Sequence, residues 1–273
     1  MDKSRRPLLQ ETATNRILAI YEQYHRPEFI GLDPLVALQR FSRSEDLEVA
    51  GLIAAVLSYG RVETIIRNVE CLFDLMENQP AEFIGATSFA EKKRCFKGFR
   101  HRFNDGADIA LLLQTIGTLI DEYGSIERFF LSLSDNGTEN ILHALSAFHR
   151  SIMAKAKLRC RTLSRNFRFL VSSPVHGGAC KRLNMYLRWM VRPNDGIDLG
   201  VWNRVPTAHL MMPVDTHVSA VARRLGLTGR KNCDWKMAEE ITAGLRTIDP
   251  VDPVRFDFSL CRSGMIAVRK VAA

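Results

Sequence analysis

The chain has 273 residues, of which 46% are hydrophobic and 25% are charged, and this balance excludes a disordered protein. Its length suffices for one large domain or two lobes with a sizeable buried core. The formal net charge of +8 favours an acidic partner, whose class depends on where the positive charge lies.

Apolar residues recur every three or four positions and alternating strand patterns are few, so we predict an all-α fold. Helices are predicted, in chain order, over residues 12–25, 47–59, 62–76, 107–123, 125–133 and 139–156. A turn at Gly177-Gly178 then precedes an amphipathic helix that begins near Lys181. After a loop-rich stretch over 193–213, two further helices are predicted over 215–225 and 235–247.

Neither a secretory leader nor a membrane span is recognisable, because the N-terminus is charged and the longest apolar run, Val49–Leu57, is too short to cross a bilayer. The six cysteines are too far apart in sequence to predict a zinc or iron–sulfur cluster. Asp195 and Asp198 lack the spacing of an EF-hand loop. We therefore expect a reduced, cytoplasmic protein with no metal, no cofactor and no membrane partner.

The positive charge is concentrated in one fifth of the chain. Between Asn140 and Asn194 there are 11 basic residues and no acidic one, which leaves 27 basic against 30 acidic residues elsewhere. The 11 are Arg150, Lys155, Lys157, Arg159, Arg161, Arg165, Arg168, Lys181, Arg182, Arg188 and Arg192. A solvated face usually mixes both signs, so this run favours a nucleic-acid partner. An anionic lipid surface and a chance cluster are the alternatives.

Lys181 lies in the first turn of its predicted helix, where the positive end of the macrodipole disfavours a cation by a few tenths to about 1 kcal/mol. A lysine amine attacks carbon only when it is unprotonated. The helix N-terminus, the adjacent Arg182 and partial burial would all favour that form. Two interpretations are open: a phosphate-binding cation helped by main-chain N–H groups at Gly177 and Gly178, or an amine nucleophile.

Asp215 follows Pro213 and precedes an apolar helical face, which is the place of an N-cap residue. Capping alone, worth roughly 1 kcal/mol, is sufficient to explain this position. His217, in the same segment, is expected to form local hydrogen bonds. Four aromatic residues follow helical spacing and are expected in the core rather than stacked on a ligand. They are Trp189, Trp202, Trp235 and Phe258.

The two segments together resemble a known family. Gly177-x-x-x-Lys181 before one helix, and Pro213-Val214-Asp215-Thr216-His217-Val218 before another, look like the helix-hairpin-helix, Gly/Pro-Asp superfamily of DNA glycosylases. Endonuclease III and the 8-oxoguanine glycosylases are members. The run over 46–58 is similar to the helix that starts the six-helix lobe of these enzymes. At family level the whole chain looks like a bacterial family of unassigned function related to that superfamily.

This resemblance implies two helical lobes with a helix-hairpin-helix element and a cleft between the lobes. The six-helix-type lobe would span residues 46–194, and residues 1–45 would join 195–273 in the second lobe. Lys181 would attack C1′ of a damaged nucleotide to form a Schiff base. Asp215 would orient or deprotonate the amine and stabilise positive charge on the sugar. The damaged base would be flipped out of the DNA duplex into a pocket.

The resemblance also implies a DNA-binding surface around the hairpin. Its predicted members are Gly177, Gly178, Arg182, Arg159, Arg161, Arg165 and Arg168. The implied function is a base-excision repair glycosylase and AP lyase on damaged bases, with oxidised purines as candidates. The alternatives are a non-catalytic nucleic-acid-binding protein on the same scaffold and a helical interaction protein whose basic run meets an acidic partner. The iron–sulfur cysteines of endonuclease III are absent, so no cluster is expected.

Overall fold

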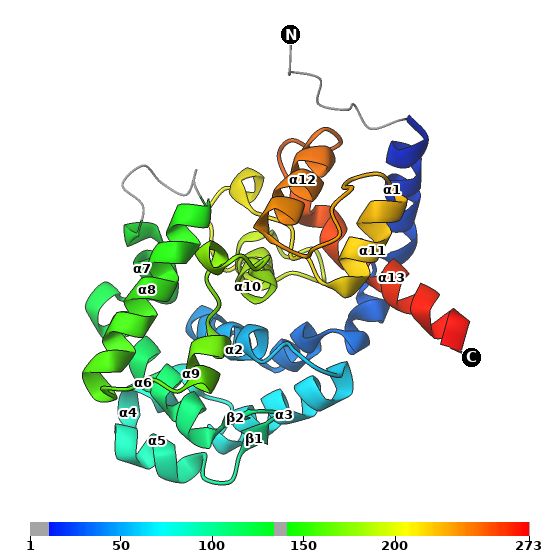
Figure 1. Ribbon diagram of the computed structural model, residues 1–273. Helices are drawn as coiled ribbons and strands as arrows, with labels where there is room; N and C mark the ends of the chain where they lie inside the picture. Colours follow the sequence, from blue (N-terminus) through cyan, green and yellow to red (C-terminus); the bar gives the residue numbers. More distant parts are fainter. Residues whose placement is uncertain (1–10, 134–140, 273) are drawn as a thin grey trace.

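The computed structural model describes residues 11–133 and 141–272 of the chain. Within these ranges the protein is mostly helical, as predicted, and contains one two-stranded antiparallel sheet (Figure 1). The α-helices are α1 (Glu11–Tyr24), α2 (Ser44–Val56), α3 (Val62–Leu75), α4 (Pro80–Ala86), α5 (Phe89–Cys95), α6 (Gly106–Tyr123), α7 (Ile126–Ser132), α8 (Ile141–Arg159), α9 (Arg165–Leu170), α10 (Lys181–Val191), α11 (Thr216–Arg224), α12 (Trp235–Arg246) and α13 (Asp257–Ala272). The strands are β1 (Arg100–His101) and β2 (Asn104–Asp105).

Short 3-10 helices occupy several of the connections. They are η1 (Pro27–Leu32), η2 (Pro34–Arg40), η3 (Pro174–His176), η4 (Thr207–His209) and η5 (Pro253–Phe256).

The long predicted helices are confirmed, with ends that differ by a few residues. The predicted helix over 139–156 corresponds to α8, although its first two residues lie outside the described part. The sequence did not predict the short helices α4, α5 and α9, the β1–β2 hairpin or the sixteen-residue helix α13. The omission of α13 matters most, because this helix contributes to the candidate site.

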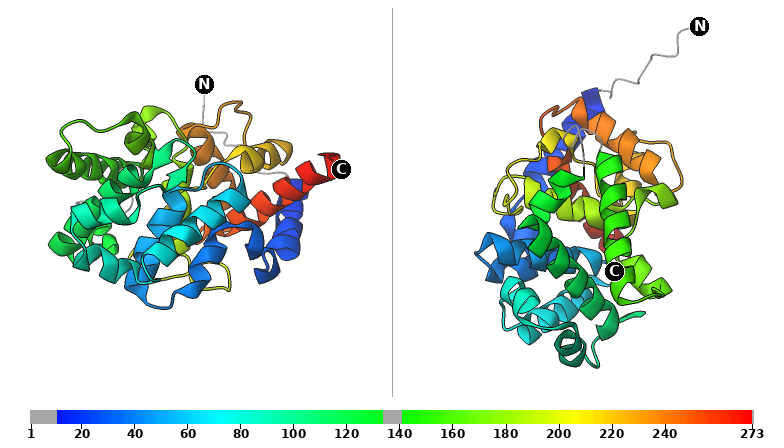
Figure 2. Two further views of the ribbon diagram at one scale, coloured as in Figure 1. Left: turned by 90° about the horizontal axis from the view of Figure 1, so that it is seen from below. Right: turned by 90° about the vertical axis from the view of Figure 1, so that its left-hand side faces the viewer.

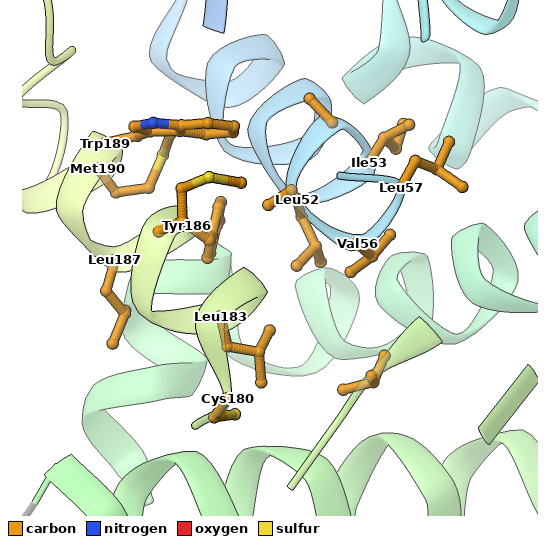
Figure 3. Packing of buried hydrophobic residues seen from close by; sticks show 14 of the residues in the cluster. Leu52, Ile53, Val56, Leu57, Cys180, Leu183, Tyr186, Leu187, Trp189 and Met190 are labelled. Atoms are coloured by element: carbon orange, nitrogen blue, oxygen red, sulfur yellow. The ribbon is translucent and has the colours of Figure 1, made fainter. Parts of the chain in front are cut away.

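The centre of the molecule is the contact between α2 and α10 (Figure 3). From Asp46 onward every residue of α2 is buried, so this helix is covered on all sides. Leu52 and Val56 of α2 lie on the side that faces α10, and the hydroxyl of Tyr186 on α10 donates to the carbonyl oxygen of Glu48 on α2. Gly51 permits the close approach, because a Cβ at this position would lie 2.6 Å from Cε of Met190. The four aromatic residues expected in the core, Trp189, Trp202, Trp235 and Phe258, are all buried.

The C-terminal helix α13 packs against α11 and also against α1, so the first and last helices of the chain are in contact (Figures 1 and 2). Gly264 of α13 sits close to α11, because a Cβ added at this glycine would lie 3.0 Å from the carbonyl oxygen of His217. The contact with α13 thus holds the N-terminal end of α11 in place. None of the described helices is long and apolar enough to cross a bilayer.

We expect Gly51→Leu to lower the free energy of unfolding by about 1–3 kcal/mol, because the larger side chain must enter the packed α2–α10 contact. Chemical denaturation followed by circular dichroism measures the change. Gly85→Leu is the matched control, since a Cβ at Gly85 of α4 meets nothing within 4 Å. Equal destabilisation of both variants would contradict the role given to Gly51.

Candidate active site

A cavity of about 540 Å³ lies where α10, α11 and α13 meet the turn between α2 and α3. Lys181 and Asp215, which are 34 positions apart in the sequence, both line this cavity. The volume of this cavity falls within the range of about 300–1,000 Å³ that is usual for small-molecule sites. The tertiary structure therefore brings the two predicted catalytic residues to one cavity.

Lys181 is the first residue of α10 and is partly exposed. The chain reaches it through Gly177 and Cys180, both in the left-handed region with φ of 85° and 51°. The Cys180 side chain is buried and offers no capping hydrogen bond to the first turn of α10. The amine is thus attached to a helix end whose partial positive charge no N-cap side chain offsets.

Asp215 is the N-cap of α11, as its position in the sequence predicts. Its Oδ1 accepts hydrogen bonds from the backbone N–H groups of His217 and Val218, each at 2.9 Å. The other oxygen, Oδ2, lies 3.9 Å from Sγ of Cys261 on α13. One carboxylate oxygen therefore stabilises the helix, and the other faces the group of side chains around the cavity.

A second carboxyl group, Asp257, lines the same cavity and was not predicted from the sequence. Its Oδ2 accepts a hydrogen bond of 2.5 Å from Nη1 of Arg188 on α10. Burial raises the pKa of Asp257 to about 6; Arg188 opposes this shift and the nearby Asp215 adds to it. The charge of Lys181 also acts on Asp257. An amine and two carboxyl groups thus share one cavity.

Cys261 and Tyr59 are two further polar groups that line the cavity. Loss of solvation and the adjacent Asp215 raise the pKa of the Cys261 thiol, so the thiol stays protonated. Burial raises the pKa of Tyr59 to about 12. Its hydroxyl bonds to Oδ1 of Asn104 at 2.5 Å, and its ring stacks on Phe103. Phe169 meets the same ring edge-on, so contacts within the protein hold Tyr59 in place at the cavity.

The basic run divides into an outward-facing and an inward-facing part. Exposed members are Arg150, Lys157, Arg159, Arg161, Arg165 and Arg168, all between the middle of α8 and the end of α9. Gly177 and Gly178 are also exposed. Lys155 forms an ion pair with Glu122. Arg182, Arg188 and Arg192 are buried, so the positive surface is smaller than the sequence indicates.

The prediction that Arg182 contacts DNA needs correction, because the side chain is only 8% exposed. Its Nη1 donates to the carbonyl oxygen of Val56 at 2.7 Å, and its Nη2 donates to that of Phe169. The guanidinium carbon also lies 4.3 Å from the centroid of the Phe169 ring. Burial lowers the pKa of Arg182 to about 10. Arg182 therefore joins the end of α2 to α9 and is not presented to a partner.

Arg188 and Arg192 bind carboxylates of the chain itself. Arg188 donates to Asp198 at 3.0 Å, and Arg192 bonds to both Asp198 and Asp195. These two aspartates, whose spacing does not match an EF-hand, are thus partners of arginines. Among residues 11–133 and 141–272, no group of three His, Cys, Asp or Glu side chains is arranged to hold a metal ion.

Sequence reasoning missed Asp257 and Cys261 because it did not predict α13. A signal was present, since Asp257 follows Pro250 and Pro253 and an acidic residue favours the first turn of a helix. The apolar positions Phe258, Cys261 and Met265 that follow lie on one helical face. Recognition of this pattern predicts the helix, although not its contact with α10.

We expect Asp257 to make the protein less stable as the pH rises. The pKa of Asp257 in the folded protein, about 6, lies above its usual value of 3.8, so the protonated carboxyl group contributes to stability. This stabilising contribution is fully present below pH 3.8 and is lost as the pH rises through about 6. The free energy of unfolding of wild type should therefore fall relative to that of Asp257→Asn between about pH 4 and about pH 7. The other carboxyl groups titrate in both proteins, so their effects on the free energy of unfolding cancel in this comparison. If the free energy of unfolding of the wild type instead rises relative to that of Asp257→Asn over this pH range, Arg188 keeps Asp257 ionised in the folded protein and the prediction is wrong.

Among known protein families, the chain matches one described as "Protein of unknown function (DUF2400)". The match covers residues 33–266, which include α2, α10, α11 and the residues of α13 that line the cavity. No curated protein and no solved structure matches the chain significantly. The matched range includes Lys181, Asp215 and Asp257, and the chain belongs to this family of unknown function.

Proposed function

We propose that the protein is a DNA glycosylase and AP lyase that removes damaged bases by Schiff-base chemistry at Lys181. The observation that carries the proposal is the common cavity of Lys181 and Asp215. The resemblance of the two helix-opening segments to the helix-hairpin-helix, Gly/Pro-Asp glycosylases adds support. The cavity would receive the extruded base, and oxidised purines remain the candidate substrates.

In this proposal the neutral Lys181 amine attacks C1′ of the damaged nucleotide. The new bond joins Nζ to C1′, the bond from C1′ to the base breaks, and the base leaves with a proton. Loss of a further proton from nitrogen and opening of the sugar give the Schiff base, from which β-elimination cleaves the strand. Asp215 accepts a proton from the amine or stabilises positive charge on the sugar through Oδ2, because Oδ1 is engaged in capping α11.

The proposed DNA path passes over the exposed Gly177-Gly178 turn between α9 and α10. A Cβ at Gly177 or Gly178 would meet nothing within 4 Å, so this turn has room for a sugar–phosphate strand. The N–H group of Gly178 would bind phosphate, because that of Gly177 already donates to the carbonyl oxygen of Pro174. The exposed arginines Arg159, Arg161, Arg165 and Arg168 would add positive charge beside the turn. The packing of α1 on α13 supports the proposed second lobe, in which the first and last segments of the chain combine.

Borohydride trapping on duplexes with an abasic site or an oxidised purine tests the nucleophile. We expect a covalent protein–DNA adduct with wild type and none with Lys181→Gln or Lys181→Ala, because only a primary amine at this position forms the reducible Schiff base. Mass spectrometry of the trapped peptide should locate the adduct on α10. An adduct that survives both substitutions, or no adduct on any of these duplexes, would exclude the proposal.

The two roles of Asp215 can be separated by substitution. Asp215→Asn keeps a good N-cap but removes the charge, and we expect it to slow adduct formation by about 10²–10⁴-fold at little loss of stability. Asp215→Ala should lose about 0.5–2 kcal/mol of stability as well. Asp105→Asn is the matched control, because Asp105 caps α6 with a similar pair of hydrogen bonds. If Asp215→Asn and Asp105→Asn form the adduct at similar rates, Asp215 has no catalytic role and only caps α11.

The second candidate function is nucleic-acid binding without catalysis, and the exposed basic residues of α8 and α9 favour it. Under either function, each phosphate contact contributes about 0.9 to the slope of log affinity against log salt. We expect Arg159→Gln with Arg165→Gln to reduce that slope by about 1–2 for a DNA duplex. The second function would be selected if wild type and Lys181→Gln both bind the duplex in a salt-sensitive way and neither forms a cleavage product.

A further inference from the structure

A second cavity, of about 390 Å³, lies among α8, α9 and η3, and none of its lining residues lines the cavity of Lys181. Its lining residues are His149, Met153, Lys157, Leu163, Arg168 and His176. Four of these six side chains are basic or imidazole groups, and none is acidic. The cavity thus brings four basic or imidazole side chains and no carboxylate together around a surface that is mostly apolar.

The two permanent cations of this cavity lack carboxylate partners. Neither Lys157 nor Arg168 forms an ion pair with the described residues, whereas the nearby Lys155 is paired with Glu122. Because a cation without an internal partner gains most from an external anion, these two side chains point to a negatively charged ligand.

The two histidines are held in a defined arrangement. Nδ1 of His149 lies 2.7 Å from the carbonyl oxygen of Val171, so this nitrogen carries the proton and donates it. The ring of His176 meets that of His149 edge-on, with centroids 5.4 Å apart. Burial, together with His176 and Arg150, holds the pKa of His149 below its ordinary value. An anion in the cavity would reverse the electrostatic part of this effect by stabilising the imidazolium.

We propose that the cavity among α8, α9 and η3 is a binding site for a phosphate group. A phosphate offers several strong acceptor oxygens to donors that converge from different elements, and its geometry suits a guanidinium and an ammonium together. This site goes beyond the proposed lyase chemistry and does not require it.

The site is tested with inorganic phosphate by isothermal titration calorimetry at constant ionic strength. We expect one saturable site, with affinity weakened about tenfold or more by Lys157→Gln and by Arg168→Gln. Histidine side-chain NMR signals of His149 and His176 should shift along the same titration. The matched control is Arg94→Gln with Lys97→Gln, which removes exposed basic residues near α5 and should leave the affinity unchanged.

Three results would overturn the proposal: no saturable binding, equal weakening by the control, or binding that leaves both histidine signals unmoved. Thermal melting checks that the variants are folded. Competition then identifies the source of the phosphate. Displacement by a 5′-phosphorylated oligonucleotide, but not by its 5′-hydroxyl form, assigns a nucleic-acid end, and displacement by a mononucleotide alone assigns a free ligand. Because these probes contain no damaged base, their outcome is independent of chemistry at Lys181.

Discussion

The buried salt bridge between Arg188 and Asp257 joins α10, the helix that begins with Lys181, to α13, the helix that packs against α11. Arg188 also binds Asp198, so one guanidinium connects three parts of the chain that are distant in sequence. Burying such charges involves a large desolvation cost, and ion pairs of this kind are weak contributors to net stability. Their geometric effect is clear: α10 cannot rotate or slide without leaving charges unpaired. The placement of Lys181 relative to Asp215 depends on this constraint.

The carboxylate of Asp215 serves the fold and the cavity at the same time. Its hydrogen bonds to two backbone N–H groups fix the side chain, which leaves Oδ2 in a defined place beside Cys261 and near Asp257. A side chain held in this way loses little entropy when a ligand arrives, which is the property required of a preorganised catalytic group. Capping and catalysis are therefore compatible interpretations of this residue.

Most of the basic residues of the run over 140–194 fall into a buried group or an exposed group. Arg188 of α10 and Arg192, the residue that follows α10, point inward and pair with aspartates from the following loop and from α13, and Arg182 joins α2 to α9. Apart from Lys155, which is paired with Glu122, the basic residues from the middle of α8 to the end of α9 are exposed, and they precede the Gly177-Gly178 turn in the chain. The structure thus separates a basic surface suited to a polyanion from a core in which the same residue type holds helices together.

The sequence by itself determined the all-α class, the long helices, the N-cap at Asp215 and the position of Lys181 at a helix start, because hydrophobic period and end signals act over a few residues. It did not reveal that Arg182 is buried, or that Asp257 and Cys261 join the cavity. Those facts depend on which helices pack together, and an arginine in a basic run looks the same in sequence whether its partner is solvent or an aspartate 69 positions away. Only the tertiary structure decided them, because burial and ion pairing are set by contacts between segments that are distant in the chain.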